Sequence, residues 1–76
     1  MSWKIDEVTE AEAIASKPTT SPADVTALLQ LVAHKLAIPV GKLEYGGPAN
    51  GINRAKVVPL KGTEETFAAA AERYNG

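Results

Sequence analysis

The sequence of 76 residues predicts one small domain that is mostly α-helical, with three to four helices and a short β-hairpin. Apolar residues recur at helical spacing through residues 22–37, and again through an alanine-rich segment at residues 63–74. Between these segments, "GGPANGIN" at residues 46–53 combines the glycine, proline and asparagine residues that tight turns need. We therefore expect the hairpin within residues 42–60.

Length and composition restrict the class of protein. A chain this short buries only about 60 to 65% of the surface that its unfolded form exposes, which leaves little room for a deep catalytic cleft. The sequence contains no cysteine, so its apolar residues must stabilise the fold without disulfides or thiolate-bound metals. Its start, "MSWKIDEV", lacks the apolar run of a signal peptide, and no segment has the roughly 20 apolar residues of a membrane span. We expect a soluble intracellular protein, in the cytoplasm or within an assembled particle, with no membrane partner.

A first helix is expected over residues 6–16. The segment "TEAE", from Thr9 to Glu12, matches a capping box, in which a hydroxyl accepts a backbone amide and a carboxylate reaches back. The apolar stripe of this helix is thin and needs a packing partner. It consists of Ile5, Val8, Ala11 and Ile14 or Ala15. Residues 17–21, rich in proline and hydroxyl side chains, are expected to be a linker.

The core helix is expected over residues 22–37. Ser21 can cap its first turn, Pro22 suits the first helical position, and Asp24 lies where the helix dipole favours a carboxylate. Its dense apolar stripe consists of Val25, Leu28, Leu29, Val32 and Leu36. His34 lies opposite this stripe and should be exposed. As the only histidine in a chain without cysteine, it is a poor candidate for a metal ligand.

The segment "LVAHKLAIPVGKLEYGG", residues 31–47, has two interpretations. In the first it is a helix-turn-helix, which needs a small residue where the helices cross and apolar residues on both sides of the turn. Ala33 would be the crossing residue, and Pro39 would open the second helix. The apolar anchors would be Val32, Leu36, Ile38 and Leu43. This pattern resembles the general helix-turn-helix motif over about fifteen residues.

In the second interpretation, the long helix ends near Ala37 and "KLEY", residues 42–45, is a strand. Leu43 and Tyr45 would then point inward, because alternate residues of a strand share a face. Two features favour this interpretation: Gly41 lies inside the proposed second helix, and a Gly-Gly-Pro run would end that helix after about two turns.

The closing helix is expected over residues 63–74, with Thr63 as its cap and Glu64 and Glu65 in its first turn. With the helix-turn-helix interpretation, the hairpin becomes a wing between that motif and the closing helix. This order is similar to that of small DNA-binding proteins such as excisionases and MerR-like domains. The similarity is architectural, and no family motif covers the chain.

Charge is distributed unevenly along the chain. Residues 1–33 hold two lysines against five carboxylates, a net charge of −3. Residues 34–62 hold five basic residues against one glutamate, or +4, and the last 14 residues hold one arginine against three glutamates, or −2. A basic central segment indicates a surface for an anionic partner. The sequence thus favours a small non-enzymatic binding module for nucleic acid, with phosphates contacted by Lys35, Lys42, Arg54, Lys56 and Lys61.

The alternative function is protein interaction or self-association, as an assembly subunit of a viral or multiprotein particle. Its interface would contain Trp3, Phe67 and Tyr74. The overall net charge of −1 favours this alternative, since DNA-binding domains of this size usually carry an excess of basic residues. No paired catalytic groups converge in the sequence, so we expect no enzyme activity, no cofactor or metal, and no small-molecule substrate.

Overall fold

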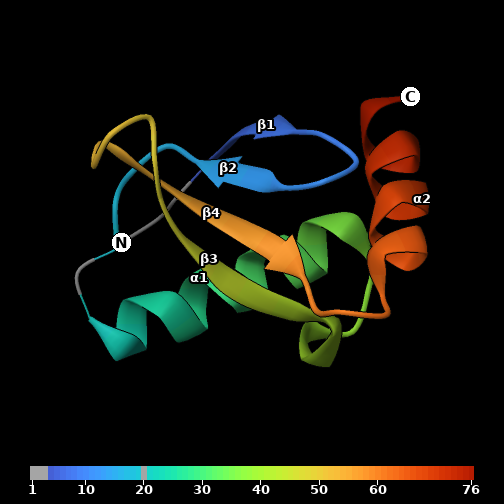
Figure 1. Ribbon diagram of the computed structural model, residues 1–76, viewed down its shortest axis with the longest axis horizontal. Helices are drawn as coiled ribbons and strands as arrows, with labels where there is room; N and C mark the ends of the chain where they lie inside the picture. The colour runs from blue at the N-terminus through green and yellow to red at the C-terminus, as the bar shows by residue number, and fades with distance from the viewer. Residues whose placement is uncertain (1–3, 20) are drawn as a thin grey trace.

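The computed structural model describes residues 4–19 and 21–76 as two layers, with a four-stranded antiparallel sheet packed against two α-helices (Figure 1). The strand order is β1-β2-β4-β3. In chain order the elements are β1 (Ile5–Val8), β2 (Ala13–Ala15), α1 (Pro22–Leu36), the 3-10 turn η1 (Val40–Lys42), β3 (Leu43–Ala49), β4 (Arg54–Pro59) and α2 (Glu64–Asn75). The prediction of a mostly helical protein with three to four helices is therefore wrong, and the fold is α+β.

The largest error concerns residues 6–16, which form the β1–β2 hairpin instead of a helix. Thr9 Oγ1 accepts hydrogen bonds from the amides of Ala11 and Glu12, each at 3.2 Å, and the Thr9 amide donates to the Glu12 carbonyl at 2.8 Å. A threonine hydroxyl can satisfy nearby amides in a turn as well as at a helix start. The hydroxyl bond expected of a helix cap thus closes a hairpin, in which the Glu12 backbone carbonyl takes the place expected for its carboxylate.

Helix α1 is the element that local sequence specifies most strongly. Ser21 Oγ accepts from the Asp24 amide at 3.2 Å, and Pro22 occupies the start of the helix. The helix ends at Ala37, whose φ of 58° is left-handed. Its buried side chains are Leu28, Val32, Ala33 and Leu36, whereas Val25 and Leu29 of the expected stripe are only partly buried. His34 is exposed, as its position opposite the stripe predicts.

After α1 the chain forms no second helix of a helix-turn-helix. The Ile38 amide donates to the Ala33 carbonyl at 3.1 Å, and the short turn η1 leads directly into β3. Leu43 is buried and Tyr45 is half-buried against the core, so the strand interpretation of "KLEY" is correct. Without a recognition helix, the β3–β4 hairpin is no wing either; it forms half of the sheet.

Both helices cover the same face of the sheet. The shared core contains Ala13, Ala15, Ala55 and Val57 from the central strands, with Leu28 and Val32 from α1 and Phe67 and Ala70 from α2. Alanines in the central strands let the helices approach closely. Thr63 occupies the N-cap position of α2, as expected, but its hydroxyl makes no capping bond and donates instead to the Leu60 carbonyl at 2.7 Å and the Lys42 carbonyl at 3.1 Å. The bonds from Thr63 and Leu60 to the Lys42 carbonyl tie this loop to η1, directly before β3, and fix the start of α2.

Candidate functional site

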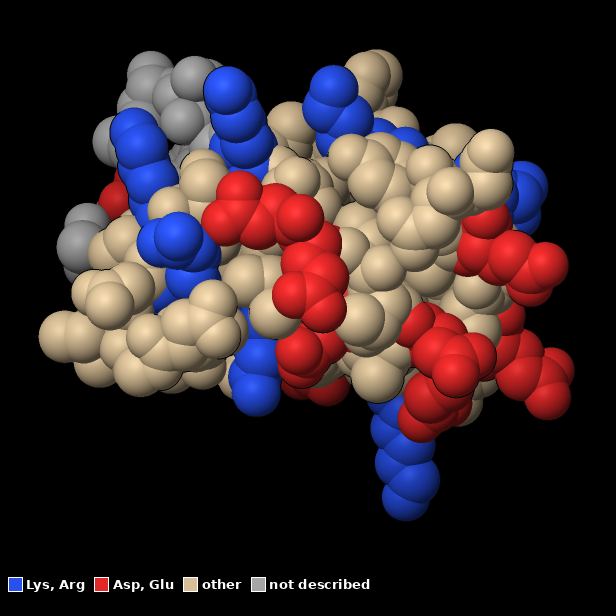
Figure 2. Space-filling model, turned by 90° about the horizontal axis from the view of Figure 1, so that it is seen from above, with Lys and Arg blue, Asp and Glu red and all other residues tan. Residues whose placement is uncertain are grey.

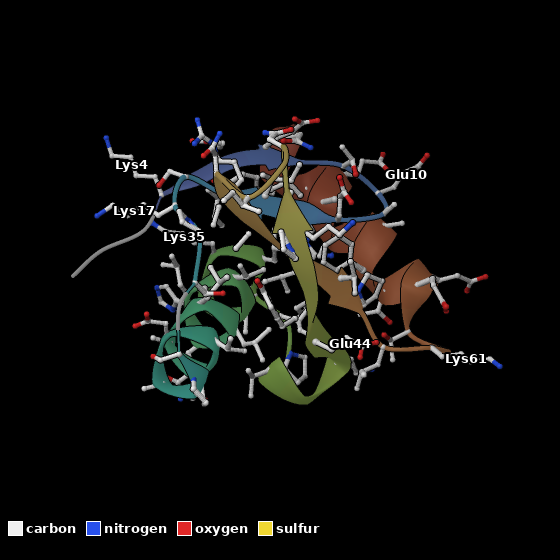
Figure 3. All side chains as sticks on the ribbon, turned by 60° about the vertical axis from the view of Figure 1, so that its left-hand side comes forward. Lys4, Glu10, Lys17, Lys35, Glu44 and Lys61 are labelled. Carbon is white, nitrogen blue, oxygen red and sulfur yellow. The ribbon has the colours of Figure 1, made fainter. Side chains whose placement is uncertain are left out.

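The five basic residues expected to bind phosphates lie in separate places. Lys42 and Lys61 lie near one end of the sheet, where the Leu60 amide donates to the Lys42 carbonyl at 2.9 Å. Lys35 lies on α1 in the helical layer, away from Lys61 (Figure 3). Arg54 and Lys56 lie on β4 in the sheet. The fold therefore gives no single surface on which all five cations meet.

The two basic residues of β4 differ in their surroundings, since Arg54 pairs with a carboxylate and Lys56 lies two strands away from one. Arg54 Nε lies 2.9 Å from Asp6 Oδ2 of β1, in an ion pair whose side chains are each about two-fifths exposed. Strand register places Glu7, Ile14 and Lys56 in one row across the sheet face that the helices leave open. Side chains paired across adjacent strands contact one another. Ile14, between the two charged residues of this row, is 7% exposed.

The residues expected at a partner interface do not form one exposed surface either. Phe67 is 1% exposed and belongs to the core, so it is unavailable to a partner. Tyr74 near the end of α2 is 42% exposed and remains available. Trp3 lies outside the described residues.

A shallow groove of about 400 Å³ lies between α2 and the turn of the β1–β2 hairpin. Its lining, which we call the alanine groove, is Glu10, Ala68, Ala69, Ala71, Glu72 and Asn75. The hairpin approaches the C-terminal part of α2 in Figure 1, and Asn75 Nδ2 donates to the Val8 carbonyl at 2.7 Å. This hydrogen bond holds the two walls together.

The chemistry of the alanine groove combines a small apolar floor with negative charge. Alanine side chains leave space that a larger apolar side chain can fill. Glu10 and Glu72 are exposed. Figure 2 shows Asp and Glu side chains across the middle and over the right-hand part of the molecule, where α2 lies in Figure 1, and Lys and Arg side chains mainly at the left and top, with others at the right-hand edge and below. The groove therefore suits a partner group that is both apolar and basic.

Sequence reasoning missed most of this site. The alanine-rich segment was expected to be a helix, but nothing in its sequence separates Ala70 and Ala71, which are buried, from Ala69, which is exposed, and Ala68, which is half-buried. The sequence predicted that Glu10 lies in a helix over residues 6–16, which instead form the β1–β2 hairpin. The signal that could have located it is the hairpin turn of residues 9–12.

Other kinds of site are not apparent in residues 4–19 and 21–76. No group of three or more His, Cys, Asp or Glu side chains there is arranged to hold a metal ion. Neither helix in these ranges has the length and apolar character needed to cross a bilayer. Comparison with protein-family models, curated proteins and solved structures found no match.

Proposed function

We propose that this protein is a protein-interaction module that binds its partner through the alanine groove. The observation that carries the proposal is an open, alanine-floored hollow with Glu10 and Glu72 at its walls. Burial of an apolar side chain provides affinity, and opposite charges at the rim favour one partner over another. The chemistry to be recognised is an aliphatic side chain with lysine or arginine beside it.

The charge arrangement favours this function over nucleic-acid binding. Affinity for a phosphate backbone needs several cations that engage it together. Here Arg54 is paired with Asp6, and Lys35 and Lys61 lie on different sides of the molecule. Carboxylates at the groove would repel phosphate.

A labelled peptide with one isoleucine between lysines tests the proposal. We expect it to bind the protein, to shift the NMR signals of Ala68 and Ala69, and to bind more weakly as salt is added, because salt screens the rim charges. The variant Ala69→Leu should reduce peptide binding, since Ala69 is an exposed groove residue and leucine fills the space while keeping the helix.

The matched control is Ala27→Leu, the same substitution at an exposed position of α1. It should leave peptide binding unchanged. Signal shifts spread over α1 instead of the groove, or equal loss of binding in both variants, would contradict the proposal. Retention of duplex DNA at low salt that Arg54→Glu with Lys56→Glu abolishes would instead favour nucleic-acid binding.

A further inference from the structure

An exposed aliphatic side chain lies at the end of the β3–β4 hairpin. Ile52 is 77% exposed, the highest value among the large apolar residues of the described chain. Asn50 and Gly51 have positive φ values of 52° and 74°, which turn the chain tightly just before it. Ile52 therefore projects from a loop tip instead of packing on its own core.

Basic side chains lie at the same end of the sheet as this loop. Ala15 pairs with Ala55, which places the end of β2 beside the start of β4. The Ser16 amide donates to the Lys4 carbonyl at 2.9 Å, so the start of β1 is there too. Lys4 and Lys17 are exposed and extend from one side of the molecule in Figure 3. We call Lys4, Lys17 and Ile52 the loop end.

The loop end and the alanine groove lie at opposite ends of the β1–β2 hairpin. Lys4 and Lys17 flank its open end, whereas Glu10 lies in its turn. Figure 3 accordingly shows Lys4 and Lys17 on one side and Glu10 on the other. One end offers an aliphatic side chain with lysines, and the other offers an alanine floor with carboxylates.

We infer that the partner of the alanine groove is a second copy of this chain, which inserts Ile52 into the groove and places Lys4 and Lys17 near Glu10 and Glu72. This inference rests on the proposed function and names its partner. Because the two surfaces differ, the contact is head-to-tail. Such a contact repeats from copy to copy and gives a closed ring or an open filament.

Sedimentation velocity over a range of protein concentrations tests this inference. The wild-type chain should form species larger than a dimer, and their population should fall as salt is added. Ile52→Ser should weaken association roughly tenfold or more, because the buried aliphatic side chain is lost. Val40→Ser is the matched control: Val40 is also exposed, at 45%, but lies in η1, outside the loop end, and its substitution should change nothing.

Mixing two variants provides the sharper test. Ile52→Ser retains a groove, and Ala69→Leu retains a loop end, so each alone should stay monomeric while an equal mixture forms dimers and nothing larger. Assembly of either variant alone to the wild-type size would overturn the head-to-tail arrangement. A wild-type chain that stays monomeric but binds the lysine-flanked isoleucine peptide overturns this inference and leaves the proposed function standing. If the wild-type chain neither assembles nor binds the peptide, both this inference and the proposed function are contradicted.

Discussion

Two adjacent leucines of α1 differ in burial. Leu28 is 0% exposed at the centre of the core, whereas Leu29 is only partly buried at its margin. We expect Leu28→Ala to lower the free energy of unfolding by about 2 to 5 kcal/mol, because it leaves a cavity among packed neighbours. Leu29→Ala should lower it by roughly 1 kcal/mol, since less apolar surface is lost.

Chemical denaturation of both variants, followed by circular dichroism, measures this difference. Equal losses of unfolding free energy would mean that Leu29 contributes to the core as much as Leu28 does.

Gly46 lies against side chains of the neighbouring strand β4. The sequence showed only that a glycine there disfavours a helix. In the structure, a Cβ on Gly46 would lie 2.8 Å from Val58 Cγ1 and 3.0 Å from Lys56 Cγ, next to an irregularity in the β3–β4 register. A larger residue here would therefore force the side chains of Val58 and Lys56 on β4 to shift. The glycine is thus explained by a cross-strand neighbour that no local pattern reveals.

At the scale of elements, the turn of the β1–β2 hairpin depends on one hydroxyl. Thr9→Ala removes the acceptor of two amide hydrogen bonds, so we expect the free energy of unfolding to fall by roughly 1 kcal/mol. Amide exchange at Ala11 and Glu12 should become faster.

Thr26→Ala is the control for this prediction. Thr26 is exposed, and its hydroxyl donates to the Pro22 carbonyl within α1, where alanine is a better helix former. The free energy of unfolding of Thr26→Ala should be unchanged or slightly higher than that of the wild-type chain. If Thr9→Ala behaved in the same way, the hairpin turn would not need the hydroxyl.

The elements that sequence predicted well are those whose signals are local. Helix α1 repeats its apolar spacing over 15 residues and has a serine cap. By contrast, β1 has four residues and β2 three, too few to separate a strand pattern from one turn of helix. All three residues of β2 are buried, so no alternation of polar and apolar residues marks it as a strand. β2 is a strand because it pairs with β1 on one side and β4 on the other.

At the scale of the whole molecule, one side chain joins the two ends of the described chain. Asn75 Nδ2 of α2 donates to the Val8 carbonyl of β1, across 67 residues. We expect Asn75→Ala to lower the free energy of unfolding by about 1 kcal/mol. Hydrogen exchange in the last turn of α2 should accelerate, because that turn loses its attachment to the sheet.

Mass-resolved hydrogen exchange of α2 and of the β1–β2 hairpin measures this effect. Unchanged exchange in the last turn would show that packing of α2 alone holds the groove wall. Neither the groove nor this hydrogen bond could be predicted from the sequence. Glu10 and residues 68–75 meet only after the sheet and α2 have packed together.

The pairing of β2 with β4 sets an order for folding. Ala15 pairs with Ala55, 40 residues later, and Ala13 pairs with Val57, 44 residues later. Closing such a long loop costs entropy before any contact between the strands compensates for it. Helix α1 and the β3–β4 hairpin need only contacts between near neighbours and avoid this cost. During synthesis on a ribosome, the β1–β2 hairpin therefore emerges first. One edge of β2 then stays unpaired until β4 has been synthesised.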